Sequence, residues 1–333
     1  MKAAFYSRKG DPHEVLQVAE RPIPEPFARE LLVRIAYSAV HPADVKRRAG
    51  TLAAPSYDEV IPHSDGSGTV VAVGPGLDSK TWLGQEVWIS NAQRGRAHGT
   101  AAEYVTLPVE LCRPIQPGYS LRDAACIGIP MICAHAAVFH HGPIKGKSLL
   151  VAGASGAVGR AALQWARWGG AKEIIAVVRK PSAIDLVASL GATRVHVHVD
   201  ESIDPQNIVS FSKEIGTVDH IVDVDIGRNA SWLQHVLSPQ VVWSAYATSQ
   251  PVALDFRQLM NSNATLRFIQ THSISATERH AALTDIDTIH REHAVSHTVG
   301  EIFPLRKVAD AHAVLERGDS RGVVLISLAG THE

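Results

Sequence analysis

The residues best suited to chemistry are three glycines in the stretch Gly153-Ala-Ser-Gly156-Ala-Val-Gly159. A glycine-rich turn lets the backbone approach a pyrophosphate closely and directs the first N–H groups of the following helix toward its charge. Alone this pattern is a weak signal. The apolar run 148–152 before it predicts a strand, however, and residues 157–168 after it predict a helix. We therefore expect a dinucleotide phosphate site at Gly153, Ala154, Ser155, Gly156, Ala157, Val158 and Gly159.

Two cations follow the next predicted strand, at Arg179 and Lys180. Proteins that bind NAD place an Asp or Glu about 20 residues beyond the motif, where it accepts from the ribose 2′-hydroxyl. This strand has no carboxylate at its end. Cations at that place favour a 2′-phosphate through charge-assisted hydrogen bonds, so we expect the cofactor NADPH. The alternative is that both are solvated surface charges.

His41 and Asp44 stand three residues apart in a predicted turn. Asp could orient the imidazole, and His could protonate an oxyanion or enolate that develops during a reaction. The alternative for this pair is a structural or ribose-binding role.

The chain contains 18 histidines, and His is the commonest metal ligand. His196 and His198 alternate on a predicted strand, and His290, His293 and His297 have helical spacing. The second group has no obvious Cys, Asp or Glu partner. We interpret these histidines as solvated or partly buried side chains and expect no metal there.

The elements that must position these residues fall into two regions with different sequence patterns. Residues 1–122 carry short apolar runs at 31–35, 69–73 and 86–89, punctuated by Pro and Gly, which predict irregular β structure. Residues 123–140 predict a helix. From residue 147, strands expected at 148–152, 174–178, 195–199, 220–224, 241–245 and 265–269 alternate with helices at 157–168, 182–190 and 206–215. Near-continuous apolar strands of this kind predict an α/β fold with a doubly wound parallel sheet.

The last 60 or so residues do not continue this alternation of strands and helices. Ser275 and Glu278 form a capping-box pattern that opens a helix to about residue 293. A second helix is expected at 307–317 and a final strand at 322–328. We expect this segment to return to the first domain, which gives a catalytic domain of residues 1–122 and 270–333 around a dinucleotide-binding domain of residues 123–269.

Composition excludes several classes of protein. The 333 residues are 45% hydrophobic and 20% charged, a balance typical of globular proteins. The net charge of −1 lacks the basic excess of a dedicated nucleic-acid binder. No apolar run approaches the roughly 18 residues that span a membrane, and the N-terminus has no signal-peptide pattern. Three cysteines are too few for a disulfide framework. We expect a cytoplasmic protein that binds neither membranes nor nucleic acid.

Five motifs resemble one known family, the medium-chain dehydrogenase/reductase superfamily, and within it the zinc-independent quinone oxidoreductase (zeta-crystallin-like) branch. They are Ala39-Val-His-Pro-Ala-Asp44, Ile61-Pro-His-Ser-Asp-Gly-Ser-Gly68, Gly99-Thr-Ala-Ala-Glu-Tyr104, Leu149-Leu-Val-Ala-Gly-Ala-Ser-Gly-Ala-Val-Gly159 and Leu190-Gly-Ala192. The resemblance covers essentially the whole chain. It implies a β-rich GroES-like catalytic domain and a Rossmann domain that binds NADPH.

The resemblance also bears on metal. Zinc-dependent members of the superfamily use a Cys, a His-Glu pair and a later Cys, and those places fall here on His41, on Ser64-Asp65 and near Ile129. Catalytic zinc takes about three protein ligands plus an open position, and this set offers at most His41 and Asp65. The four cysteines of the structural zinc lobe are also missing. We expect no zinc.

Further site residues are implied by the resemblance. The cofactor is expected to contact Cys133, His198, Val224, Ala245, Tyr246 and Phe268 in addition to the glycine turn, Arg179 and Lys180. The substrate is expected near Lys46, Ser64, Asp65, Trp88, Asn91 and Arg94, with His41 and Asp44 as catalytic residues. The chain departs from the branch at three positions: His41 replaces Asn, Cys133 replaces Thr, and Lys46 replaces a frequent aromatic residue.

We expect an NADPH-dependent oxidoreductase that transfers hydride to a quinone or an α,β-unsaturated carbonyl compound without zinc. The alternatives are an NADPH-dependent carbonyl reductase or alcohol dehydrogenase of a specialised pathway, and a non-catalytic protein that binds NADPH or RNA. The resemblance further implies a homodimer that pairs through the last strand of the Rossmann sheet, residues 265–269.

Overall fold

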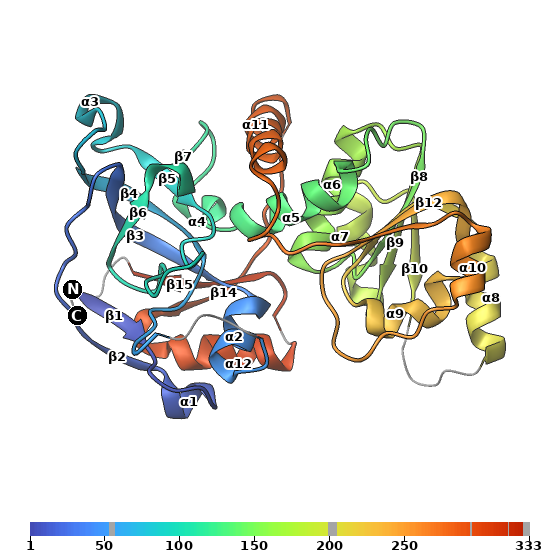
Figure 1. Cartoon of the computed structure of the whole chain (residues 1–333), viewed down its shortest axis with the longest axis horizontal. Helices are drawn as coiled ribbons and strands as arrows, with labels where there is room; N and C mark the ends of the chain where they lie inside the picture. The colour runs from blue at the N-terminus through green and yellow to red at the C-terminus, as the bar shows by residue number, and fades with distance from the viewer. Residues whose placement is uncertain (53–56, 199–204, 294, 319, 329–333) are drawn as a thin grey trace. The chain divides into compact units, whose positions relative to one another are not determined.

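In the computed structural model the chain forms two compact units, one of residues 1–129 and 297–333 and one of residues 130–296. The structure describes residues 1–52, 57–198, 205–293, 295–318 and 320–328. Each unit is built around its own sheet, and the labels of the elements are those of Figure 1.

The second unit is a doubly wound α/β domain. Its six parallel strands run in the order β10-β9-β8-β11-β12-β13, and helices flank both faces (Figure 1). This order reverses direction between β8 and β11, which is the switch point where dinucleotides bind in such folds. The strands are β8 (Ser148–Ala152), β9 (Glu173–Val178), β10 (Arg194–Val197), β11 (Val218–Asp223), β12 (Leu237–Ala245) and β13 (Thr265–Phe268).

Helices of this unit follow the predicted alternation closely. They are α5 (Gly128–Phe139, which begins in the first unit), α6 (Ala157–Trp168), α7 (Ile184–Ser189) after the 3-10 turn η2 (Pro181–Ala183), α8 (Pro205–Ile215), α9 (Ile226–Leu233), α10 (Phe256–Asn261) and α11 (Ala276–Glu292). Their apolar faces and the strands enclose a core that includes Leu150, Ile221 and Trp243. Each such side chain contributes about 1.5–3 kcal/mol by leaving water.

The first unit is β-rich. Its larger sheet has the order β14-β15-β3-β4-β5-β7, with β6 also paired to β3, and a separate ribbon joins β1 (Lys2–Phe5) to β2 (Gln17–Glu20). The sheet strands are β3 (Glu30–Val40), β4 (Asp65–Val73), β5 (Glu86–Ile89), β6 (Tyr104–Pro108), β7 (Cys112–Pro114), β14 (Val299–Pro304) and β15 (Val323–Ser327).

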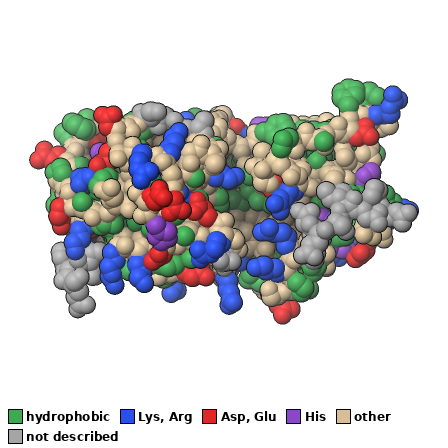
Figure 2. Space-filling view, turned by 90° about the horizontal axis from the view of Figure 1, so that it is seen from below, with side chains coloured by type: hydrophobic (Ala, Val, Ile, Leu, Met, Phe, Trp, Pro, Cys, Tyr) green, Lys and Arg blue, Asp and Glu red, His purple; other side chains and the backbone are tan. Residues whose placement is uncertain are grey.

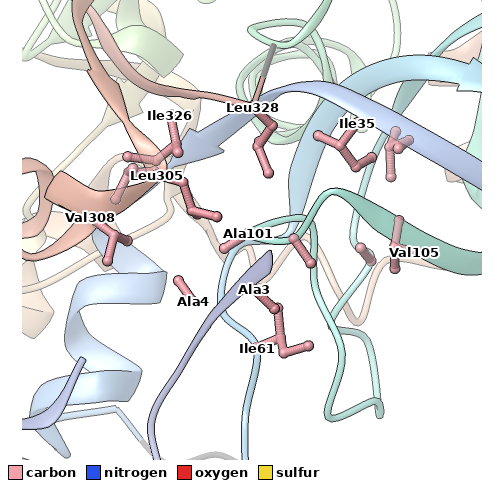
Figure 3. Close-up of a cluster of buried hydrophobic side chains, with 14 of the residues drawn as sticks. Ala3, Ala4, Ile35, Ile61, Ala101, Val105, Leu305, Val308, Ile326 and Leu328 are labelled. Atoms are coloured by element: carbon pink, nitrogen blue, oxygen red, sulfur yellow. The ribbon is translucent and has the colours of Figure 1, made fainter. Parts of the chain in front are cut away.

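Short helices complete this unit: α1 (Pro12–Val15), α2 (Pro42–Ala49), α3 (Ser79–Trp82), η1 (Val109–Leu111), α4 (Leu121–Ala124), η3 (Leu305–Lys307) and α12 (Val308–Arg317). Figure 3 shows how the end of the chain joins the core: Leu305, Val308 and Ile326 lie beside Ala3 and Ile61 from its beginning. The fold class expected from the sequence, a doubly wound parallel sheet in one unit and β-rich structure in the other, is confirmed.

Several boundaries differ from expectation. The helix expected over residues 123–140 is divided into α4 and α5 by a turn at 125–127. Residues 270–296 lie in the second unit, because α11 bonds to the helices of that unit: His135 Nε2 lies 2.8 Å from Asp285 Oδ2, and Trp168 Nε1 donates to Glu292. Strand β14 was missed, since Gly300 and Pro304 hide its apolar pattern. Val199, the expected end of β10, lies outside the described residues.

Candidate active site

His41 and Asp65 form a buried pair in the first unit. His41 immediately precedes α2 and is 5% exposed, and Asp65 opens β4 with no exposed surface. The Nε2 atom of His41 lies 2.8 Å from Asp65 Oδ2. Strand β3 ends at Val40, beside the start of β4, because Ala39 is the register partner of Asp65. This pairing brings together two residues that are distant in the sequence.

Two backbone N–H groups also donate to the Asp65 carboxylate. Asn91 N is 3.2 Å from Oδ1, and Ile129 N is 2.5 Å from Oδ2. Ile129 stands in the first turn of α5, where helix N–H groups lack partners inside the helix and favour an anion. Gly128 permits this approach, since a Cβ there would lie 2.5 Å from Oδ2. Three N–H donors therefore converge on one buried carboxylate.

The charge of Asp65 governs the protonation of His41. Burial alone lowers the pKa of the His41 imidazole, but the nearby Asp65 carboxylate and its hydrogen bond outweigh this and raise the pKa above its ordinary value. His41 consequently holds its proton to a higher pH than a free histidine. A buried histidine whose pKa is raised by a carboxylate partner can act as a general acid.

Asp44 contacts the backbone of His41 and not, as expected, its imidazole. Its Oδ2 accepts from the backbone N–H of His41 at 2.8 Å, which caps the start of α2. Burial raises the pKa of Asp44. The carboxylate bonded to the His41 imidazole is Asp65, which the sequence analysis had assigned to the substrate. The sequence could not separate the two, because only the β3–β4 pairing brings Asp65 to the imidazole.

The expected substrate residues divide into two groups. Ser64 is buried beside Asp65, with its Oγ 3.4 Å from Nη1 of Arg47, a residue that the sequence analysis missed. Lys46 is half-buried on the same helix. The other three residues have different surroundings. Trp88 is a buried core side chain of β5, and Arg94 is exposed. Asn91 has a left-handed φ of 59° and donates its backbone N–H to Asp65.

The residues at the zinc positions do not fit zinc. Only His41 and Asp65 carry ligating side chains, and the Asp65 oxygens already accept from His41, Asn91 and Ile129. Zinc in a catalytic site takes about three protein ligands. Across the part of the chain that the structure describes, no group of three or more His, Cys, Asp or Glu side chains is arranged to hold a metal ion.

The glycine turn of the second unit lies between β8 and α6, as expected. Gly153 has a left-handed φ of +73°, and a Cβ there would lie 2.4 Å from Val224 Cγ1. A Cβ on Gly159 would lie 2.4 Å from the carbonyl oxygen of Gly153. Both positions therefore require glycine for a tight turn and a close helix. Gly156 caps α6, so the turn leads directly into a helix N-terminus suited to a pyrophosphate.

Arg179 and Lys180 follow the end of β9 and are exposed. Strand β9 pairs with β8, so its carboxyl end lies at the same edge of the sheet as the glycine turn. Two positive charges therefore lie at the edge of the sheet where the glycine turn is found.

Most of the other cofactor residues implied by the resemblance lie at the ends of strands of the same sheet, whereas Cys133 lies on α5. Ala245 and Tyr246 end β12, and the Tyr246 N–H donates to the carbonyl of Asp223. Burial raises the pKa of Cys133 to about 11, so its thiol is not ionised at neutral pH. His198 stacks on Phe211 with ring centroids 4.6 Å apart, and Phe268 is 68% exposed at the end of β13.

Asp223 was missed. It ends β11 beside the turn and has no exposed surface. It accepts from Trp243 Nε1 at 3.1 Å, Asn229 Nδ2 at 2.7 Å and Asp225 N at 3.0 Å. Burial nevertheless raises the pKa of Asp223 to about 6. The signal in the sequence was an acidic residue at the carboxyl end of a predicted apolar strand.

Two of the histidines whose spacing suggested a metal site have local partners. His196 Nδ1 lies 3.0 Å from Glu214, and His290 Nδ1 lies 2.6 Å from the carbonyl of Ile286.

Two family descriptions match the chain: "Alcohol dehydrogenase GroES-like domain" over residues 28–117 and "Zinc-binding dehydrogenase" over residues 190–326. A quinone oxidoreductase of Pongo abelii is 26% identical over 96% of this chain and 94% of the relative. A zinc-type alcohol dehydrogenase-like protein of Schizosaccharomyces pombe is 32% identical over 65% of this chain and 68% of the relative. The structure of mycobacterial Rv1454c complexed with NADPH has a TM-score of 0.85 at 23% identity, covering 98% of this chain and all (100%) of that one.

Proposed function

The chain belongs to the medium-chain dehydrogenase/reductase superfamily, in its zeta-crystallin-like quinone oxidoreductase branch, and from that premise we propose a specific reaction. It is an oxidoreductase that binds a nicotinamide cofactor. The proposed reaction is transfer of hydride from NADPH to a quinone or an α,β-unsaturated carbonyl compound, without zinc.

The buried His41–Asp65 pair carries this proposal. Hydride addition to a conjugated carbonyl places negative charge on oxygen, and that charge must be stabilised or protonated. A zinc ion would do this as a Lewis acid, but the residues here do not fit one. His41, with its raised pKa, supplies a proton instead. Quinones and enones suit this arrangement because their negative charge delocalises.

The glycine turn, Arg179 and Lys180 support the choice of NADPH. When bound, NADPH supplies the hydride. Gly153 and Gly159 allow the backbone to approach the pyrophosphate, and the N-terminus of α6 favours its charge. Arg179 and Lys180 replace the carboxylate that would accept from a 2′-hydroxyl, and they favour a 2′-phosphate.

The test is oxidation of NADPH, followed at 340 nm, with a panel of quinones, enones, aldehydes and ketones. We expect turnover of quinones or enones, and NADPH to be preferred over NADH. Turnover of aldehydes or ketones alone would make the protein a carbonyl reductase. Absence of turnover with tight NADPH binding would make it a binding protein. Elemental analysis should find no stoichiometric zinc, and chelators should leave the activity unchanged.

We also propose a homodimer formed through β13. This strand lies at the edge of the six-stranded sheet, and edge strands pair readily with a second copy. Phe268 on the strand is 68% exposed, and Phe256 and Met260 on the preceding helix are 76% and 52% exposed. Light scattering should give the mass of a dimer, and Phe268→Glu should shift it to a monomer. A monomeric unmodified protein would contradict the proposal.

The proposed partners are small molecules. Figure 2 shows Lys and Arg together with Asp and Glu side chains on one face, in keeping with the net charge of −1. No helix within the described ranges is long and apolar enough to cross a bilayer. Cys112, Cys126 and Cys133 are free and buried, as is usual in a reducing compartment, and we propose a cytoplasmic location.

A further inference from the structure

Four fully buried side chains form a continuous set of hydrogen bonds beside the His41–Asp65 pair. His312 Nε2 of α12 lies 2.9 Å from His63 Nε2, and His63 Nδ1 lies 2.8 Å from Ser38 Oγ. Ser38 Oγ lies 2.7 Å from Thr100 Oγ1, which donates to the backbone carbonyl of Asp65 at 2.6 Å. None of the four side chains has exposed surface.

The last bond fixes the direction of all the others. A carbonyl oxygen can only accept, so the Thr100 hydroxyl proton is committed to Asp65. Ser38 must therefore donate to Thr100, and His63 Nδ1–H must donate to Ser38. A neutral imidazole has only one N–H, so His63 Nε2 must accept from His312 Nε2–H.

The remaining nitrogen agrees with this direction. His312 Nδ1 is buried without a hydrogen-bond partner. In the derived arrangement it is the unprotonated nitrogen, and a lone pair without a partner costs less there than an N–H would. Burial also lowers the pKa of both imidazoles, and the Arg48 guanidinium adds to the effect at His312. Both histidines are therefore neutral, as the direction requires.

The set of bonds holds a strained turn. His63 has a left-handed φ of 78°, unusual for a residue with a side chain, and it lies two positions before Asp65. The turn is also held by the segment before β6, where Thr100 N donates to the His63 carbonyl at 3.0 Å. Such strain persists when surrounding contacts over-determine the conformation. Here those contacts reach from the turn to the C-terminal helix.

We propose that His63 and His312 are positioning residues for the proposed reaction. Together with Ser38 and Thr100 they form a one-directional hydrogen-bond chain from α12 to the backbone carbonyl of Asp65. By fixing this backbone, the chain holds the Asp65 carboxylate against His41. His312 is the start of the chain because its Nε2–H is the first donor. This inference rests on the proposed function for its catalytic consequence, but its tautomers can be measured without any substrate.

The first test is ¹⁵N NMR of histidine-labelled protein, with the two signals assigned by their loss in His63→Asn and His312→Gln. We expect both imidazoles to be neutral near pH 7, with His63 protonated at Nδ1 and His312 at Nε2. Any other tautomer, or a cationic ring at either residue, would overturn the chain.

The second test compares variants of α12. Phe at position 312 cannot donate, whereas Gln keeps an N–H donor. We expect His312→Phe to lower kcat about tenfold with little change in the KM for NADPH, and His312→Gln to recover most of the loss, because small misplacements of a reacting group are costly. Val308→Ala is the matched control: it removes core packing from the same helix and should lower Tm with kcat unchanged.

The outcomes separate the two proposals. The expected tautomers without turnover of any quinone or enone would leave the hydrogen-bond chain in place and reject the proposed function. Turnover with an unchanged kcat in His312→Phe would reject the positioning role. Equal losses of kcat in His312→Phe and Val308→Ala would also reject it, because general destabilisation would then explain the effect.

Discussion

The His41–Asp65 pair and the glycine turn are assembled in opposite ways. The turn consists of consecutive residues between one strand and one helix, and its exposed neighbours Arg179 and Lys180 project from the end of the adjacent strand. Asp65 instead gathers donors that are 24, 26 and 64 residues away, and its surroundings exclude water. Local sequence suffices for the turn itself, whereas the donors around Asp65 come together only when the sheet has formed.

Burial also makes the electrostatic interactions at the His41–Asp65 pair differ in strength from those at Arg179 and Lys180. A charge in a water-poor interior interacts strongly with its neighbours, whereas exposed charges are screened by water and salt. The effect of changing a residue should therefore follow its burial rather than the unit in which it lies. The buried Asp223 of the second unit provides one test, and the exposed Arg179 of the same unit provides the opposite one.

The largest effect is expected at Asp223, as a dependence of stability on pH. Its pKa is raised to about 6 by burial, from 3.8, so between about pH 4 and pH 6 the folded state binds more protons than the unfolded state. The free energy of unfolding should therefore fall as pH rises through this window, by up to about 3 kcal/mol.

Urea unfolding at a series of pH values measures this slope. Asp223→Asn removes the titrating group and should flatten the slope, whatever its effect on absolute stability. Asp185→Asn, at an exposed position of the same unit, should leave the slope unchanged. If the free energy of unfolding depends on pH with the same slope in the unmodified protein and in Asp223→Asn, Asp223 titrates normally. Burial would then not determine how much a residue contributes to the pH dependence.

The next effect is expected at His41. Replacement by Gln keeps hydrogen-bonding capacity but removes the titratable proton. Because the pKa of His41 is raised, activity should persist below that pKa and fall as pH rises through it. In His41→Gln, kcat should drop about 10²-fold and its pH dependence should flatten.

His98→Gln is the control for this change, because His98 is an exposed histidine of the same unit. It should keep both the rate and the pH profile, and NADPH affinity should be unchanged in both variants. If His41→Gln retains the full profile, His41 is a structural or ribose-binding residue and not the acid.

The smallest effect is expected at Arg179. Arg179→Ala should raise the KM for NADPH about tenfold and leave that for NADH nearly unchanged, since an exposed charge-assisted hydrogen bond is partly screened. High salt should weaken the binding of NADPH more than that of NADH. Lys172→Ala, at an exposed position just before the opposite end of β9, should change neither. Equal affinity of the unmodified protein for both cofactors would make Arg179 a surface charge.

Much of the second unit could be predicted because its signals are local. The bounds of β8 and α6 agree with the sequence pattern, and the capping box at Ser275 opens α11 as expected. The helix expected over residues 307–317 ends, as α12, at Gly318, whose left-handed φ of 70° glycine adopts easily. Strand β14 could not be predicted, because its parallel partner β15 stabilises it through tertiary pairing.

The sequence by itself determined the alternation of strands and helices in the second unit, the glycine turn and the two cations that follow β9, because each depends on residues that are neighbours along the chain. Only the tertiary structure decided that Asp65, and not Asp44, bonds to the His41 imidazole. It also decided that His312 lies against His63. These contacts depend on strand register and helix packing between distant segments. The spacing of residues along the chain does not predict which distant side chains come into contact in the folded core.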